Sequence, residues 1–416
     1  MKRYQVSIVI IIAFCLLPCI AIAASNLVIL DSKDIPEMRD CIAGLEAKGA
    51  RIVHVFPPCV VIGDFSSVSS VSSVSAFSAS SHEIIPGIKA IYQNRVPDSV
   101  IQSIPHTSSI GIEVWNARWT SRTGVNPAPT MAKAPVLSTE ELPPPVDDCR
   151  ILKKQYPLTS APYLKAPPYG GDFYDTSSYM AGRVAVGIIL PESSGNTENW
   201  TADEVNKVIS EIQAAMDWWA SIEPDGHLSF YYDIHTPFDG TQSVKIATEP
   251  ITTSDGGTWI KQVMNAIGYT NPGQGIVRDY LYYVFDYNND IRDMLGTHWA
   301  FTIFAADSSN DKDGCFPDSG FAYAYLGGPF MVVTYDNQNY GIDNMDAVCA
   351  HETGHIFYAL DEYSGASSKT ERSGYLDVIN ANHASNPASV PCIMKGLTSP
   401  FANHQVCYYT RGQLGL

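Results

Sequence analysis

A proline-rich stretch divides this chain of 416 residues into two folding units. Proline lacks a backbone N–H and fixes φ, so a dense run of prolines can form neither a helix nor a central strand. We therefore expect residues 120–170 to be an extended linker, with one folded unit before it and another after it. The ten prolines are Pro127, Pro129, Pro135, Pro143, Pro144, Pro145, Pro157, Pro162, Pro167 and Pro168.

Before the linker, residues 25–119 have the pattern of a small α/β unit. Short apolar segments alternate with turn residues in the order strand, helix, strand, strand. A serine-rich loop is expected to follow at 66–81. The expected elements are a strand at Asn26–Leu30, a helix at Pro36–Lys48 and strands at Arg51–Phe56 and Cys59–Ile62.

The first 24 residues have the pattern of a secretory signal peptide. Lys2 and Arg3 precede the short apolar run Val6–Leu17, and Ala21-Ile22-Ala23 offers a small-x-small cleavage site. The run is too short for the roughly 30 Å hydrocarbon core of a bilayer, which argues against a stable membrane anchor. We therefore expect a secreted protein, extracellular or periplasmic, whose cysteines can pair.

The chain is acidic, with 26 Lys and Arg against 43 Asp and Glu and a net charge of −17. Because no basic face is available, the charge argues against nucleic acids and anionic membrane surfaces as partners. We expect a monomer whose partners are protein or peptide substrates.

After the linker, residues 171–416 have the order of an α/β sandwich. A buried strand at Arg183–Leu190 is followed by a long helix with Thr201 as N-cap and Glu204 in the capping-box position. Further strands are expected at Leu228–Ile234, Leu281–Phe285, Trp299–Ala305 and Phe330–Thr334.

The most specific motif is His351-Glu352-Thr353-Gly354-His355, an HExxH sequence within a helical segment at 343–360. Histidines at i and i+4 lie on one face of a helix, at a separation suited to tetrahedral zinc. Glu352 lies beside them, where it can take a proton from water instead of binding the metal. The motif predicts a catalytic zinc site.

A catalytic zinc usually has three protein ligands, so a third must come from outside the motif. Asp361 follows His355 by six residues. Glu362 is the next local candidate, and His383 or His404 would require a longer return of the chain.

These residues resemble the metzincin peptidases, whose motif is HExxHxxGxxH or HExxHxxGxxD. His351, Glu352, His355 and Asp361 match the second form in register. The resemblance implies a metzincin-like zincin domain with a mixed, mostly parallel sheet and an active-site helix, and Asp361 as third ligand. Tyr358 stands where metzincins have glycine, so we expect the turn after the helix to differ.

Two further resemblances are more local. His351-Glu352-x-x-His355 followed by Asp361-Glu362-Tyr363 is similar to secreted immunoglobulin-A-type metallopeptidases, which carry DEY one residue further along. The strand and helix order of residues 25–119 resembles the ferredoxin-like pro-domains of secreted peptidases, which implies a zymogen.

The metzincin resemblance also implies a methionine turn beneath the metal. Pro391–Gly396 looks like this turn, with Met394 packed under the imidazoles; a core methionine is the alternative. Tyr408 or Tyr409 would stabilise an oxyanion, as a tyrosine does in some metzincins. Residues 320–334 resemble the edge strand that binds extended substrates, although an ordinary core hairpin has the same alternation.

Two acidic segments offer oxygen ligands at alternate positions, as calcium loops do: Asp286-x-Asn288-x-Asp290 and Asp311-x-Asp313-Gly314. Neither has the full twelve-residue pattern, so calcium is a secondary expectation beside solvated turns.

Seven of the nine cysteines follow the signal peptide. Proximity along the chain suggests Cys41–Cys59, Cys315–Cys349 and Cys392–Cys407 disulfides, although spacing alone cannot fix connectivity. Cys149 would then remain single, in the linker. As in the cysteine switch of some metzincins, its thiolate would bind zinc and keep the enzyme latent; a free thiol or an intermolecular disulfide is the alternative.

The sequence therefore predicts a secreted zinc metalloendopeptidase made as a pre-pro-enzyme. The domains are a signal peptide at 1–24, a pro-domain at 25–119, the linker at 120–170 and a zinc metallopeptidase domain at 171–416. Two alternatives remain: a secreted adhesin or binding protein with a structural zinc, and a zinc hydrolase of non-peptide amides or esters.

Overall fold

The computed structural model describes residues 25–68, 87–120, 149–153, 171–194, 199–222, 224–239, 244–247, 256–270, 279–311, 313–316 and 320–416. The predicted signal peptide, most of the serine-rich loop and most of the linker lie outside these residues.

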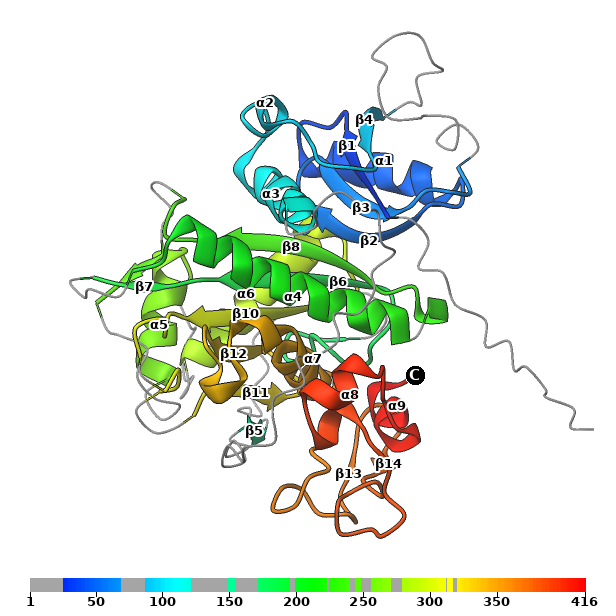
Figure 1. Cartoon of the computed structure of the whole chain (residues 1–416), viewed down its shortest axis with the longest axis vertical. Coiled ribbons are helices and arrows are strands. Elements are labelled where there is room, and N and C mark those ends of the chain that lie inside the picture. The colour runs from blue at the N-terminus through cyan, green and yellow to red at the C-terminus, as the bar shows by residue number, and fades with distance from the viewer. Residues whose placement is uncertain are drawn as a thin grey trace, which may run out of the picture.

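One ten-stranded sheet runs through both folding units, in the order β4-β1-β3-β2-β8-β6-β10-β12-β11-β5 (Figure 1). From β8 to β12 the strands are parallel, and β11 is antiparallel to β12. The predicted α/β class with a mostly parallel sheet in the second unit is therefore confirmed. The strands are β1 (Asn26–Leu30), β2 (Arg51–Phe56), β3 (Val60–Asp64), β4 (Ile88–Tyr92), β5 (Cys149–Lys153), β6 (Arg183–Ile189), β8 (Ser229–His235), β10 (Trp299–Ala306), β11 (Ala322–Leu326) and β12 (Phe330–Thr334).

The first unit contains the predicted strand, helix, strand, strand order. Strands β4, β1, β3 and β2 form its antiparallel part of the sheet. Helix α1 (Ile35–Glu46) starts where predicted, because the side chain of Asp34 accepts a hydrogen bond from the backbone N–H of Glu37 at 2.9 Å. Helices α2 (Asp98–Ile101) and α3 (His106–Thr120) complete the unit.

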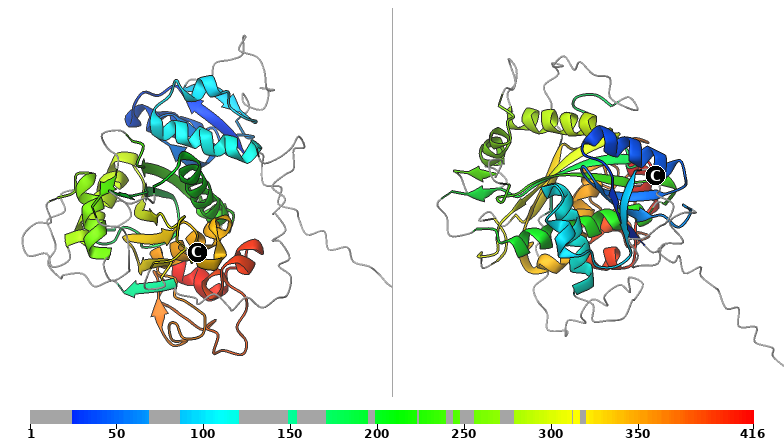
Figure 2. Two further views of the ribbon diagram at one scale, coloured as in Figure 1. Left: turned by 60° about the vertical axis from the view of Figure 1, so that its left-hand side comes forward. Right: turned by 90° about the horizontal axis from the view of Figure 1, so that it is seen from above.

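Helices cover both faces of the sheet in the second unit. Figure 2 shows α5 (Gly256–Ala266) and α6 (Asp279–Leu295) on one side, and α4 (Ala202–Ile222) on the other. Helix α7 (Met345–Ile356) packs against α4, where the indole of Trp219 donates a hydrogen bond to the carbonyl of Ala350 at 3.0 Å. Helix α7 also contacts β11 and β12, so it lies between α4 and the sheet edge.

One predicted strand is wrong. Residues 281–285 lie inside α6, not in the sheet. A run of five mostly apolar residues fits a strand and a buried helix equally well. The buried residues Tyr283, Val284 and Tyr287 show that the helix turns this segment against the sheet.

The chain after α7 forms short elements beneath that helix (Figure 1). These are β13 (Arg372–Ser373), β14 (Val378–Ile379), the 3-10 turn η6 (Ile393–Lys395), α8 (Thr398–Ala402) and α9 (Tyr408–Leu414). Elsewhere in the second unit, β7 (Glu192–Ser193) and β9 (Lys245–Ile246) form a two-stranded sheet. The described residues there also include the 3-10 turns η2 (Pro224–Gly226), η4 (Gln338–Tyr340) and η5 (Ile342–Asn344). Among the described residues, no helix combines the length and hydrophobicity needed to cross a membrane.

The first unit is joined to the second by strand pairing. Strand β2 runs parallel to β8, with His54 opposite Phe230. The His54 ring is fully buried between the units: its Nδ1 lies 2.8 Å from the Tyr232 hydroxyl, and its Nε2 lies 2.7 Å from a carboxylate oxygen of Asp217 on α4. Helix α3 packs on α4, and α1 contacts α6. The first unit therefore covers the β8 edge of the strands contributed by the second unit.

This junction predicts that the first unit stays bound after the linker is cut. A site for a specific protease inserted within 121–148 would separate the chain into two fragments. Because β2 satisfies the hydrogen-bonding edge of β8 and the junction buries a hydrogen-bonded His54, we expect the fragments to co-elute in size-exclusion chromatography without denaturant. Separate elution of the two fragments under native conditions would contradict this.

Candidate metal centre

Three predicted residues meet at the C-terminal end of α7. The Nε2 atoms of His351 and His355 are 3.2 Å apart, and they lie 3.1 and 3.2 Å from Oδ1 of Asp361. All three side chains are buried. Tetrahedral zinc with bonds of about 2.0–2.1 Å separates its ligand atoms by roughly 3.3 Å, so the three atoms fit one zinc ion. The structure thus brings Asp361, the third ligand that the metzincin resemblance implies, next to both imidazoles.

The backbone orients both imidazoles. His351 Nδ1 lies 2.8 Å from the carbonyl oxygen of Ile393, and His355 Nδ1 lies 2.8 Å from that of Ala359. A carbonyl accepts only, so each Nδ1 carries the proton and donates, which leaves each Nε2 lone pair for a metal. Sequence patterns could not indicate these partners, because any residue supplies a carbonyl.

The buried charges also suit a cation. Burial would lower the pKa of His351, but the hydrogen bond and charge of Asp361, together with the charge of Glu352, raise it to about 9. For Asp361, burial is outweighed by the two histidines, and its pKa is held well below the usual range. The cluster therefore holds positive charge tightly. Glu352 is fully buried beside the cluster on the same helix, α7.

The other candidates for the third ligand lie elsewhere. His404 is exposed and contacts the hydroxyl of Ser221 through Nδ1 at 3.3 Å. His383 Nδ1 contacts the hydroxyl of Ser385 at 2.9 Å. Glu362, although next to Asp361, points into a different cluster with Cys392 and Cys407.

The turn after α7 keeps a glycine-like conformation without glycine. Tyr358 has φ of 72°, in the left-handed region, so the expectation of a different turn is wrong for the backbone. The N–H groups of Tyr358 and Gly327 both donate to the carbonyl of His355, each at 2.9 Å. A tyrosine there costs about 1–2 kcal/mol, which these bonds and the packing of the ring against Gly327 offset. The chain therefore returns to place Asp361 at the histidines.

Met394 lies directly beneath α7 in η6 and is fully buried. A Cβ added to Gly354 would come within 2.5 Å of its sulfur, so glycine inside the HExxH motif lets the methionine approach the helix. Met394 thus packs against the helix that carries both histidines, a position that fits the predicted methionine turn and a core methionine alike.

We expect Gly354→Ala to be destabilising because of this contact. The added methyl group overpacks the space above Met394, at a cost of about 1–3 kcal/mol in the free energy of unfolding. In a Met394→Ala background the same substitution should cost much less, since the sulfur is gone. Urea unfolding of the four variants measures the coupling; equal costs in both backgrounds would contradict the contact.

Tyr408 is 82% exposed at the start of α9, and its ring lies edge-on to that of the partly buried Tyr409. The oxyanion role expected for one of these tyrosines stays a prediction. Asp286, Asn288 and Asp290 lie in α6, where residues two apart point to different sides, and Asn288 is fully buried. The calcium loop expected there is wrong. Among the described residues, Asp311 and Asp313 belong to no group of converging ligands.

The predicted disulfides are absent among the described residues. The cysteine side chains described there are not joined in disulfides. Cys59 Sγ lies 3.5 Å from the Ser108 hydroxyl, and Cys315 Sγ lies 3.3 Å from the Asp313 carbonyl oxygen. Of the predicted pairs, Cys392 and Cys407 do lie close, with their Sγ atoms within 4.8 Å of each other, but they form no disulfide. The side chain of Cys149 lies outside the described residues, so its role as a latency switch stays a prediction. The cysteines that form no disulfide are Cys41, Cys59, Cys315, Cys349, Cys392 and Cys407.

The predicted edge strand is a hairpin of β11 and β12 next to α7. Its outer strand, β11, is paired with β5 from the linker, in parallel register from Ala322 opposite Cys149 to Leu326 opposite Lys153. The edge that the sequence predicted for an extended substrate is therefore occupied by the chain itself.

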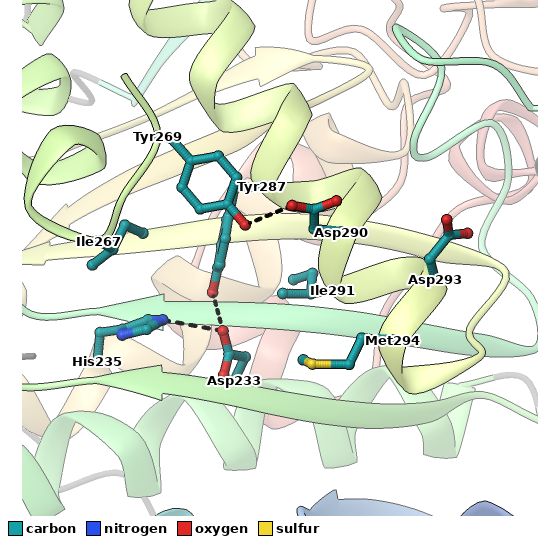
Figure 3. A pocket seen from close by; sticks show the side chains of 9 residues that line it. All are labelled: Asp233, His235, Ile267, Tyr269, Tyr287, Asp290, Ile291, Asp293 and Met294. Atoms are coloured by element: carbon teal, nitrogen blue, oxygen red, sulfur yellow. Dashed lines mark hydrogen bonds and ion pairs between the residues drawn. The ribbon is translucent and has the colours of Figure 1, made fainter. Parts of the chain in front are cut away.

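A separate cavity of about 580 Å³ lies between β8 and α6, on the other face of the sheet from α7 (Figure 3). Asp233 at its base accepts hydrogen bonds from the Tyr287 hydroxyl at 2.8 Å and from His235 Nε2 at 3.1 Å. At its rim, the Tyr269 hydroxyl donates to Asp290 at 3.1 Å. None of these residues contacts the proposed metal ligands. They form a hydrogen-bonded and charged network that lines the cavity.

The His235–Asp233 pair predicts a pH window for stability. Despite burial, the charge and hydrogen bond of Asp233 raise the pKa of His235, and those of His235 with Tyr287 lower the pKa of Asp233. The contribution of His235 to the free energy of unfolding is complete below about pH 6.5 and is lost as the pH rises through its raised pKa. The contribution of Asp233 is present above about pH 3.8 and is lost as the pH falls through its lowered pKa.

We therefore expect Asp233→Asn to reduce the free energy of unfolding most between about pH 4 and pH 6.5, and less at pH 9. Urea unfolding of wild type and variant across this range provides the comparison. The lost Tyr287 hydrogen bond gives a constant offset, so a difference that does not vary with pH would contradict the ion pair.

Comparison with known proteins gives little. Neither a protein-family model nor a curated protein matches this chain. Among solved structures, metalloproteinase-II from Bacteroides fragilis is similar with a TM-score of 0.28 and 10% sequence identity. The match covers 57% of this chain and 53% of that chain, about half of its length. A likeness this distant carries no argument, so function rests on the site itself.

Proposed function

We propose that this chain is an exported zinc metalloendopeptidase of metzincin type. The observation that carries the proposal is the meeting of three ligand atoms, from His351, His355 and Asp361, at tetrahedral spacing with a buried Glu352 on the same helix. A purely structural metal does not need Glu352, which disfavours the binding-protein alternative.

The residues divide the chemistry between them. His351, His355 and Asp361 would hold zinc, which when bound polarises a substrate carbonyl and makes water more acidic. Glu352 accepts a proton from the attacking water and delivers it to the leaving amine. The carbonyl groups of Ile393 and Ala359 keep the imidazoles in the correct tautomer. Hydrolysis of an amide bond follows from these roles.

We further propose that the structure is that of a latent zymogen. Two observations support this: β5 occupies the outer edge of β11, and the side chains of His351, Glu352 and Asp361 are enclosed. A peptide substrate binding by strand addition would have to displace β5. Cleavage on both sides of β5 would release it, whereas the first unit would remain on β8.

The substrate class is tested by profiling. A variant of the chain is made with a specific protease site within 121–148 and another within 154–170, and part of the sample is cut at both. The cut and uncut samples are then incubated with a peptide library and with a panel of non-peptide esters and amides. We expect internal peptide cleavage by the cut sample only. Turnover confined to the non-peptide panel would favour the alternative hydrolase, and no turnover with retained zinc would favour the binding protein.

A further inference from the structure

A second cluster of metal-type ligands lies behind the first. A carboxylate oxygen of Glu362, Sγ of Cys392 and Sγ of Cys407 all lie within 4.8 Å of one another. Their side chains are 0%, 0% and 5% exposed, respectively. They come from three separate places: the residue after Asp361, the start of the methionine turn and the N-cap of α9. We propose that these residues bind a second, structural zinc ion.

The contacts of Glu362 support a cation at this place. Its Oε1 accepts hydrogen bonds from the Cys407 thiol and the Thr410 hydroxyl, each at 2.9 Å, and its Oε2 accepts one from the Asn382 amide. Within the described chain, every partner of this buried carboxylate is neutral. A buried carboxylate is costly unless a charge compensates it, and a divalent ion would do so.

The donor set is that of zinc. Two cysteine sulfurs and one carboxylate are typical zinc ligands, and four-coordination needs one more donor. The hydroxyl oxygen of Thr410 lies 2.9 Å from Glu362 Oε1, 3.3 Å from Cys392 Sγ and 3.5 Å from Cys407 Sγ, so it borders all three ligand atoms. On binding, each thiol releases its proton to solvent and no electron is transferred.

The location gives the ion a structural task. The backbone N–H of Glu362 donates to the carbonyl of Met394 at 2.8 Å, and the neighbouring carbonyl of Ile393 holds the imidazole of His351. Zinc at this cluster would tie the methionine turn to α9 and to the segment that carries Asp361. It would therefore stiffen the support of the proposed catalytic site without touching substrate.

Zinc counting tests the site independently of activity. Full-length chain, reduced, loaded with zinc and freed of excess metal, is analysed by elemental mass spectrometry. We expect two zinc ions per chain in wild type, one in Cys392→Ser/Cys407→Ser, and one in His351→Ala/His355→Ala. If the wild-type chain binds both zinc ions but hydrolyses no peptide, the proposed function is wrong while the second zinc site is supported.

Cobalt substitution guards against misfolding of the cysteine variant. Cobalt bound to thiolate gives an intense charge-transfer band that the histidine and carboxylate site cannot give. We expect the band in wild type and in His351→Ala/His355→Ala. Its absence from both overturns the proposal. The intact mass of protein purified without reductant gives a second check. If the wild-type mass is two hydrogens lower than the sequence predicts, and this deficit disappears when Cys392 and Cys407 are replaced, the two cysteines form a disulfide and the proposal is wrong.

Discussion

Replacing Glu352 with glutamine should abolish peptide cleavage while leaving zinc bound. The substitution keeps the size of the side chain but removes the carboxylate that accepts a proton. General-base catalysis typically contributes a factor of about 10²–10⁴ to the rate. We therefore expect kcat/KM of the cut enzyme to fall by at least about 10²-fold, at unchanged zinc content. The measurement is cleavage of a quenched peptide together with metal analysis.

A matched control is Glu46→Gln, the same change at an exposed position at the end of α1. It should leave both the rate and the zinc content unchanged. If Glu352→Gln retained the wild-type rate, Glu352 would not be the base, and the proposed division of roles would be wrong.

Replacing Asp361 with asparagine should weaken zinc binding more than any other single change outside the two histidines. The variant removes the negative charge that pairs with both imidazoles and leaves, in place of one of the three ligand atoms, a neutral amide oxygen that binds zinc weakly. Loss of a residue that merely orients a ligand already costs about 10–100-fold in metal affinity, so loss of the ligand itself should exceed about 10²-fold. Competition with a chromogenic chelator measures the affinity, and activity should fall in parallel.

Asp377→Asn is the matched control for this substitution. Asp377 lies in the same C-terminal segment but is exposed, and it pairs with the exposed Arg372 at 2.9 Å. An exposed pair contributes about 0–1 kcal/mol, so neither zinc affinity nor activity should change. Wild-type zinc affinity in Asp361→Asn would return the question of the third ligand to His383, His404 or Glu362.

The convergence of His351, His355 and Asp361 was predictable because its signal is local. The i, i+4 spacing of His351 and His355 fixes their geometry once the segment is helical, and Asp361 follows within two turns. The backbone at Tyr358 was not predictable, because side-chain preference argues against a left-handed conformation there. Neighbouring hydrogen bonds and packing override that preference.

Long-range features of the fold were out of reach. Pairing of β2 with β8 joins residues far apart in the sequence, and nothing in either strand specifies its neighbour. The same holds for β5 on β11 and for the position of Glu362 beside Cys392 and Cys407, although the sequence did suggest that these two cysteines lie close to each other. Residues 281–285 were misassigned for a different reason, since a short apolar run does not show whether its period is that of a strand or a helix.

The most direct test of the account is cleavage of an unfolded protein substrate by chain from which β5 has been released. We expect hydrolysis at internal peptide bonds, loss of hydrolysis when a chelator removes the metal, and its return when zinc is added back to the chelator-free protein. Hydrolysis that survives removal of all metal, or none at any zinc concentration, would contradict the claim that His351, His355 and Asp361 form the centre of a zinc peptidase.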